Sequence, residues 1–507
     1  MDLKERLERL HELDRRLVTL QDAIAVLGFD EETVMPQEAS GERGEQLALL
    51  SGLRHEEATG GELRDLVASL EGEEGLDSVD CALVHHHKRF LETEGKLPRS
   101  FVEEEAAAIA TSQSAWVRAR SEDDYASYAP ILERIVDLER RKAEYIRPGA
   151  DPYDTLLDLY EEGMDEAKVA SVFDPLEDDI HAIMDRLGDG SVEDSFLYHD
   201  YDRDRLHAFC LDVISRMGFD SHRGCVSISA HPFTSCLGRD DVRITTRYSD
   251  PSWFDSISTI VHECGHALYD MHATLNPATR GSSLGNGRSM SLHESQSRFW
   301  ENMILRDRPF WMCMYADLQK ALPFMEGVSL NHFLRAINQA RPSAIRVNAD
   351  ELTYPLHIIM RFRLERDLIR GDLSVRDLAE AWREESLRTV RYRVENDSEG
   401  CLQDVHWPQG MFGYFPSYAL GSIAAASFKK SLEEAVGGND RLDEAIASGD
   451  WKVVTDWQDR AIWHSGSIYG FDECVRRVTG RELDVAAYNE YLVDKFTRQR
   501  GGENPEG

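Results

Sequence analysis

The sequence predicts a mainly α-helical, bundle-like fold with a small β-hairpin. Leucines recur at three- and four-residue intervals over residues 3–28, which indicates a long amphipathic helix. Similar periodicity runs through most of the 507 residues. Residues 225–248 depart from it, since short stretches there alternate apolar and polar side chains around a Gly-Arg-Asp-Asp turn.

Apolar spacing places the remaining elements in order. Before the hairpin, helical patterns cover about 43–72, 77–94, 100–120, 122–147, 165–187 and 203–217. After it they cover about 308–321, 328–341, 350–370, 374–395 and most of 417–498. The hairpin strands are expected at 225–233 and 241–248. Residues 1–500 are expected to form one domain, with two lobes around a cleft as an alternative, and 501–507 a disordered tail.

The acidic excess of the chain limits its partners. Aspartate and glutamate number 93 against 57 lysines and arginines, which gives a formal net charge of −36. Such a surface repels nucleic acids and anionic membranes, so neither is an expected partner. It is also typical of proteins that stay soluble in concentrated salt.

Two further features predict a cytoplasmic location. The first residues, MDLKERLERL, indicate a charged helix rather than a secretory signal, and no stretch reaches the roughly 18 apolar residues of a membrane span. The eight cysteines are scattered without a Cys-x-x-Cys pair, which is typical of reduced thiols.

The motif His-Glu-Cys-Gly-His within an apolar run predicts a metal site. Positions four apart lie on one face of a helix, so His262 and His266 can bind one cation while Glu263 projects beside it. This arrangement is typical of zinc hydrolases. A core helix with two polar histidines is disfavoured, because burying these groups without a metal is costly. Asp255 or Ser256 is expected to cap the helix.

A catalytic zinc needs a third protein ligand and an open position. Glu294, at the start of a second helical pattern, is the expected third ligand. His293 is the alternative, but adjacent helical positions point about 100° apart, so one of the two can face the metal.

Further segments complete a family pattern. They read FDEETVMP at 29–36, HPF at 231–233, DVRIT at 241–245, IRVNAD at 345–350 and GCLQDVHW at 400–407. With HECGH and HESQ, they closely resemble the Taq-type metallocarboxypeptidase family, whose motifs HPF, DxRxT, HExxH, HES(G)Q, IRxxAD and GxxQDxHW recur here in order. Phe29 stands where that family has tryptophan, outside the expected chemistry.

The resemblance implies a mostly helical fold with a long, deep substrate groove, usually assembled as a homodimer. It implies an enzyme that releases single C-terminal residues from peptides with broad specificity and uses zinc or cobalt. An endo- or dipeptidyl-peptidase of the same architecture is one alternative, and a non-catalytic helical scaffold is another.

The resemblance also implies roles for the motif residues. His262, His266 and Glu294 are expected to hold the metal, and Glu263 to act as general base. Asp270, one turn after His266, is a candidate to orient a ligand imidazole.

The oxyanion of the tetrahedral intermediate needs donors besides the metal. His406 and Tyr414 are the expected donors, with Tyr418 as the competing phenol. Gly410 and Gly413 flank this segment and predict a mobile loop.

Recognition of the substrate's terminal carboxylate calls for a guanidinium group. Arg346 is the expected partner, and Arg243 is the alternative. Two other expectations complete the set. His231, Gln403 and Tyr418 are expected to contact the substrate, and Asp241 and Asp350 to be structural partners of the arginines.

Overall fold

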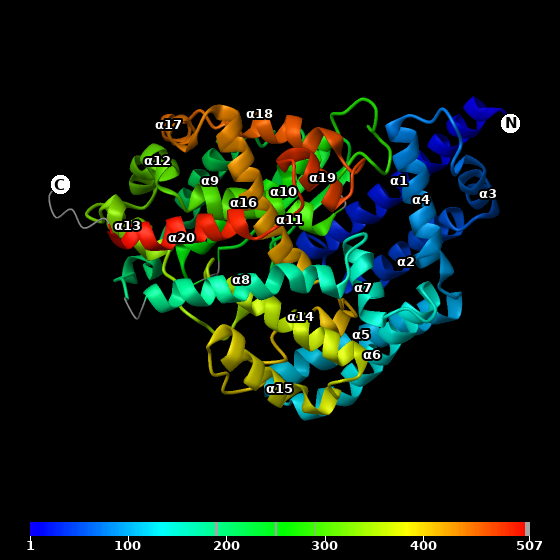
Figure 1. The fold of residues 1–507 in the computed structure, drawn as a ribbon, viewed down its shortest axis with the longest axis horizontal. Coiled ribbons are helices and arrows are strands. Elements are labelled where there is room, and N and C mark those ends of the chain that lie inside the picture. The colour runs from blue at the N-terminus through cyan, green and yellow to red at the C-terminus, as the bar shows by residue number, and fades with distance from the viewer. Residues whose placement is uncertain (188–190, 249–250, 288, 502–507) are drawn as a thin grey trace. The chain divides into compact units, whose positions relative to one another are not determined.

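The computed structural model describes residues 1–187, 191–248, 251–287 and 289–501. The chain forms two compact units (Figure 1). The first unit comprises Met1–Leu91, Val192–Ile337 and Ala424–Leu483, and the second comprises Glu92–Ser191, Asn338–Ile423 and Asp484–Gly507. The predicted tail, 501–507, lies outside the described residues apart from Gly501, which ends the last helix.

The first unit is built mainly from helices. They are α1 (Leu3–Thr33), α2 (Ser40–Ala58), α3 (Gly61–Leu70), α4 (Ser78–Glu92), α9 (Arg203–Met217), α10 (Trp253–Ala273), α11 (Met290–Arg298), α12 (Arg308–Ala321), α13 (Leu330–Ile337), the larger part of α16 (Pro416–Val436), α17 (Asn439–Ser448), α18 (Lys452–Ala461) and α19 (Phe471–Thr479). A π-helical segment, Phe299–Leu305, continues α11.

The second unit is also helical. It contains α5 (Arg99–Glu122), α6 (Tyr125–Ile146), α7 (Pro152–Tyr160), α8 (Glu166–Leu187), α14 (Tyr354–Arg370), α15 (Leu378–Glu385), the start of α16 (Pro416–Val436) and α20 (Ala486–Gly501). The mainly α-helical prediction is confirmed. α7 was not predicted, although Asp151 caps it and Pro152 occupies its first turn, which is a local start signal.

The small sheet of the first unit has three strands rather than the two expected. β1 (Gly224–Ile228) and β2 (Thr234–Gly238) flank β3 (Asp241–Thr246). β3 pairs antiparallel with β2 and parallel with β1. The predicted turn is present, but it joins β3 to β2, so residues 225–233 are not the hairpin partner that the sequence suggested.

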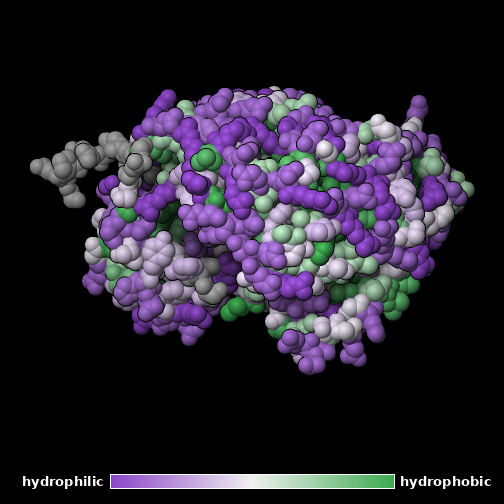
Figure 2. Space-filling view, turned by 90° about the horizontal axis from the view of Figure 1, so that it is seen from below, coloured by the Kyte–Doolittle hydropathy of each residue, from purple (hydrophilic) through white to green (hydrophobic). Residues whose placement is uncertain are grey.

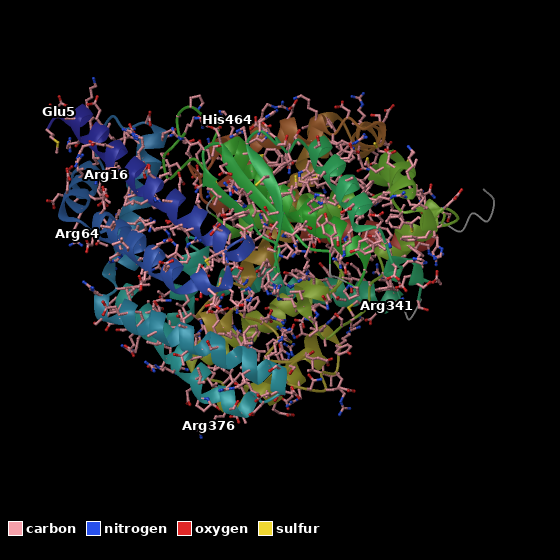
Figure 3. The ribbon with its side chains drawn as sticks, turned by 180° about the vertical axis from the view of Figure 1, so that it is seen from behind. Glu5, Arg16, Arg64, Arg341, Arg376 and His464 are labelled. Carbon is pink, nitrogen blue, oxygen red and sulfur yellow. The ribbon has the colours of Figure 1, made fainter. Side chains whose placement is uncertain are left out.

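α10 forms part of the core of the first unit. Most of its side chains are buried, because apolar residues occupy much of its circumference. Ser252 caps it by accepting a hydrogen bond from the Phe254 N–H, so the predicted caps Asp255 and Ser256 lie inside the helix. α10 packs against β3, and α1, which carries the labelled Glu5 and Arg16, packs against β2 (Figure 3).

The surface carries many polar side chains. The face drawn in Figure 2 is mostly hydrophilic, with scattered apolar residues. None of the described helices combines the length and apolar character that crossing a membrane requires. All eight cysteines lie within the described residues and are unpaired thiols.

Candidate metal centre

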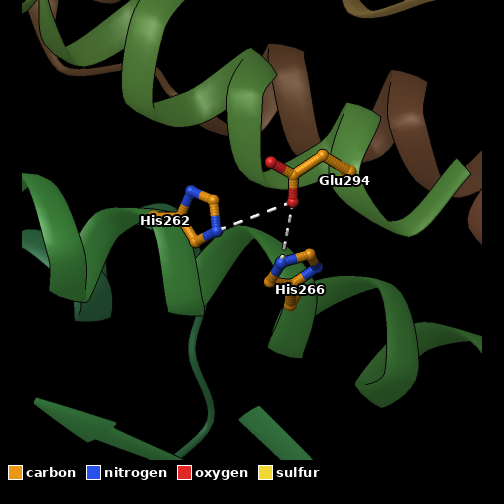
Figure 4. Close-up of side chains that lie close together, drawn as sticks. All are labelled: His262, His266 and Glu294. Carbon is orange, nitrogen blue, oxygen red and sulfur yellow. Dashed lines mark ion pairs between the residues drawn. The ribbon is translucent and has the colours of Figure 1, made fainter. Parts of the chain in front are cut away.

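Three side chains of the first unit converge on one point (Figure 4). His262 and His266 extend from α10 and Glu294 extends from α11, with one potential ligand atom of each within 4.8 Å of the others. Glu294 Oε2 lies 3.7 Å from His262 Nε2 and 3.5 Å from His266 Nε2. Ligand atoms roughly 2.1 Å from a tetrahedral zinc ion are about 3.4 Å apart, so the three side chains fit such an ion.

Gly265 explains how α11 approaches α10 so closely. A Cβ atom at this position would lie 2.7 Å from both the Gln296 carbonyl oxygen and Ser297 Cα. The two helices therefore meet backbone against backbone between the histidines of the motif. This contact brings Glu294, two residues before Gln296, to the face that carries the imidazoles.

Glu301 orients the first histidine. Its Oε2 lies 2.8 Å from His262 Nδ1, so Nδ1–H donates and Nε2 remains available as a ligand atom. Sequence reasoning missed this residue. The sequence feature that could have identified Glu301 is its spacing of seven residues from Glu294, which places both carboxylates on one helical face.

A two-residue relay orients the second histidine. His266 Nδ1 lies 3.0 Å from His293 Nδ1, and His293 Nε2 lies 3.2 Å from Asp270 Oδ1. If His293 donates to Asp270, its Nδ1 accepts from His266, which leaves His266 Nε2 free to bind a cation. Asp270 therefore reaches the predicted ligand His266 through His293, and His293 is not one of the three convergent residues.

The local electrostatics favour a cation. Burial alone would raise the pKa of Glu294, but Arg298 at 2.6 Å and the two histidines hold it well below its usual value. Burial would lower the pKa of His262, but Glu294 and Glu301 raise it to about 9. Two carboxylates beside one imidazole therefore stabilise positive charge at this point.

Glu263 is buried beside this group of ligands and is not part of it. Its Oε2 accepts a hydrogen bond of 2.7 Å from the Thr234 hydroxyl of β2. Thr234 follows the HPF segment directly and was not predicted as a site residue. Its strand fixes the carboxylate of the expected general base.

The expected substrate residues of the sheet differ in their surroundings. His231 is exposed in the loop between β1 and β2. Arg243 forms a two-pronged ion pair with Asp241 at 2.8 and 2.6 Å, which confirms the expected pairing. The guanidinium also lies over the Phe29 ring, and Phe29 packs on Phe233, so the position that differs from the family supports this strand.

The second unit brings together the remaining predicted residues, which are Arg346, Gln403, His406, Tyr414 and Tyr418. His406 Nε2 lies 3.2 Å from the Tyr418 hydroxyl, and the His406 and Tyr414 ring centroids are 5.5 Å apart. Burial beside Arg346 lowers the pKa of His406 to about 3, so its imidazole is neutral near pH 7.

Arg346 is buried and pairs with Asp404, which sequence reasoning missed. Asp404 Oδ1 lies 2.9 Å from Arg346 Nη2, while Oδ2 accepts a 2.7 Å hydrogen bond from Arg361 Nε. The expected partner, Asp350, instead accepts hydrogen bonds from backbone N–H groups, including that of Thr353. The sequence feature that could have identified Asp404 is its position in the QDVHW segment, two residues before His406.

Both ends of the Gln403 amide are engaged by backbone groups. Its Oε1 accepts a hydrogen bond from the Arg346 N–H at 2.9 Å, and its Nε2 donates to the carbonyl oxygens of Ala344 and Glu399 at 3.1 and 2.7 Å. Gln403 thus helps to hold the segment that carries Arg346.

Residues 9–496 match the family described as carboxypeptidase Taq (M32) metallopeptidase. The chain belongs to this family. It is 34% identical to thermostable carboxypeptidase 1 of Pyrococcus furiosus over 486 residues, covering 95% of this chain and 96% of the relative. It is 33% identical to carboxypeptidase 1 of Bacillus subtilis over 490 residues, covering 96% and 97%.

Solved structures agree with this membership. An M32 carboxypeptidase from Deinococcus radiodurans R1 superposes with a TM-score of 0.94 at 34% identity, covering 98% of this chain and all of the other. The chain is therefore a metal-dependent carboxypeptidase, for which peptide substrates are expected. The family membership favours this activity over the endopeptidase and scaffold alternatives.

Proposed function

We propose that the chain releases single C-terminal amino acids from peptides with broad specificity, and that Glu263 is its general base. The observation that supports this most directly is the position of Glu263, which lies beside the three convergent ligands and is held by Thr234 instead of joining them. A carboxylate placed in this way is free to exchange protons with solvent or substrate.

The ligand set supports zinc as the metal, since two imidazoles and one carboxylate are typical of catalytic zinc sites, with cobalt as the alternative. When bound, the ion would polarise the scissile carbonyl and make the attacking water more acidic. The imidazoles of His262 and His266 retain 19% and 17% exposure, so substrate can approach the ligand side of α10.

The proton transfers are assigned to Glu263. It takes a proton from the attacking water and later passes it to the departing amine. His406 and Tyr414 are proposed to stabilise the oxyanion, with Tyr418 as the alternative because its hydroxyl contacts His406. A neutral His406 would act as a hydrogen-bond donor rather than as a cation.

Arg346 is proposed to bind the substrate carboxylate, with Arg243 as the weaker candidate. Arg346 and Arg361 share one carboxylate, that of Asp404, so this buried cluster keeps one net positive charge. The charge of Arg243 is matched by Asp241. His231, Gln403 and Tyr418 stay predicted substrate contacts, and residues 1–500 are proposed to act as one carboxypeptidase domain.

A Glu263→Gln variant tests the central assignment. We expect metal content equal to the parent and turnover reduced by several orders of magnitude, measured after reconstituting the apo-enzyme with zinc or cobalt. Blocked dipeptides and longer peptides are the substrates, and mass spectrometry should reveal a ladder losing one C-terminal residue at a time. Internal cuts, or a variant as active as the parent, would contradict the proposal.

Two properties of the whole protein are also proposed. The family resemblance suggests a homodimer, which light scattering of the purified protein would test through its mass. Eight unpaired thiols suit a reducing compartment, so we propose a cytoplasmic location, to be tested by cell fractionation.

A further inference from the structure

Glu365 of α14 is a fully buried side chain that none of the proposed steps uses. Its two oxygens accept three hydrogen bonds. Trp407 Nε1 donates to Oε1 at 2.8 Å, while the Gly413 N–H and the Tyr153 hydroxyl donate to Oε2 at 3.1 and 3.0 Å. Two of these donors are the first and last residues of the segment 407–413, which is called the tethered loop below.

The tethered loop lies between two residues with proposed catalytic roles. His406 directly precedes its first donor, and Tyr414 directly follows its last. We infer that Glu365 is a positioning residue, which holds His406 and Tyr414 in place by tying both ends of the loop to α14. This inference rests on the proposed function, because it assumes that these two side chains act on the substrate.

The packing of the loop supports this inference. The Trp407 and Phe412 rings stack with centroids 5.8 Å apart, so the loop closes on itself. Gly413 has φ +89°, and a Cβ atom there would lie 2.9 Å from the backbone of Leu156 and Leu157 in α7. The glycine that suggested a mobile loop thus lets the chain pack against a helix backbone.

A second contact from α14 holds the other side of His406. Arg361 lies one helical turn before Glu365 and binds Asp404, two residues before the histidine, at 2.7 Å. Asp404 and Trp407 are therefore both tied to one rigid helix, and His406 lies between them. Burial raises the pKa of Glu365 to about 8 against the effect of its three donors, and both oxygens can accept hydrogen bonds in either protonation state.

A Glu365→Gln variant tests the inference, because the amide nitrogen that replaces one oxygen cannot accept a hydrogen bond. At least one of the three donors then faces another donor. We expect faster amide hydrogen exchange in peptides covering residues 405–415, and a kcat lower by about tenfold or more with metal content and KM little changed. Tyr153→Phe is the matched control, since it removes the donor outside the loop and keeps both tethers.

The control should retain kcat within about threefold of the parent. Trp407→Phe removes one tether only. Its kcat and its amide exchange rate over residues 405–415 should lie between those of the parent and those of Glu365→Gln, which keeps the test usable if the Gln variant fails to fold. The inference is overturned if Glu365→Gln has the amide exchange rate and the kcat of the parent. It is also overturned if Tyr153→Phe loses as much kcat as Glu365→Gln. Full activity of His406→Gln and Tyr414→Phe would instead refute the proposed roles of these residues. The amide hydrogen exchange of the tethered loop would still show whether Glu365 holds it in place.

Discussion

The Thr234 hydroxyl lies 2.7 Å from Oε2 of Glu263 and 2.9 Å from its carbonyl oxygen. A hydroxyl has one proton, so it serves one of these acceptors at a time, and the shorter contact is to the carboxylate. A strand residue therefore sets the orientation of a carboxylate that a helix carries. The proposed proton transfer would use the other carboxylate oxygen, Oε1.

This contact predicts a kinetic effect. Thr234→Val removes the donor at nearly constant volume and should lower kcat by about ten- to a hundredfold, because hydrogen bonds to charged groups contribute about 1.5–3 kcal/mol. Metal content should not change. Thr234→Ser keeps the hydroxyl and should restore most of kcat, and equal rates for the valine and serine variants would show that the contact has no catalytic effect.

Gly265→Ala should separate α10 from α11. The added methyl group would overlap the backbone of Gln296 and Ser297, so we expect a loss of about 1–3 kcal/mol in the free energy of unfolding and weaker metal binding. Urea denaturation and zinc titration measure the two effects. Gly28→Ala in α1 is the control, because a Cβ there meets nothing within 4 Å and alanine favours helix.

Glu301→Gln should weaken metal binding without abolishing it. The substitution removes a negative charge and the strongest acceptor for His262 Nδ1, and changes of this kind typically reduce metal affinity about 10–100-fold. Competition with a chelator measures the affinity. Glu365→Gln removes a buried carboxyl of the second unit and should leave the affinity unchanged; an equal loss in both variants would argue against a specific role for Glu301.

The buried His406 should make stability depend on pH. Its folded pKa of about 3 lies below the ordinary value of 6.5, so an unfolded chain binds more protons between these values. The resulting stability is present above about pH 6.5 and is lost as pH falls toward 3, at up to about 1.4 kcal/mol per pH unit.

Urea denaturation at pH 7 and pH 5 tests this effect. The parent should lose more free energy of unfolding between these values than a His406→Gln variant, by about 2 kcal/mol. His357, whose pKa burial also lowers, contributes equally to both proteins and cancels in the comparison. Identical losses would mean that His406 takes up its proton equally well in the folded state.

The local spacing of apolar residues in the sequence was sufficient to predict most of the helices. Apolar periodicity predicted the long helices, including α1 and α9, because burying one helical face requires that spacing. It missed the nine-residue α7 and the strand β2, which are short and are stabilised by their neighbours. The convergence of His262 and His266 was predictable for the same reason, since four-residue spacing places both on one helical face.

The sequence by itself determined the metallopeptidase motif and the helical class, and it favoured Glu294 over His293 as the third ligand. Tertiary structure alone decided which groups orient the site residues. Thr234 contacts Glu263, Glu301 contacts His262, and Asp404 rather than Asp350 pairs with Arg346. Helical spacing is a local property that residue order encodes directly. Hydrogen-bond partners tens of residues apart depend on how helices and strands pack, which only the folded chain specifies.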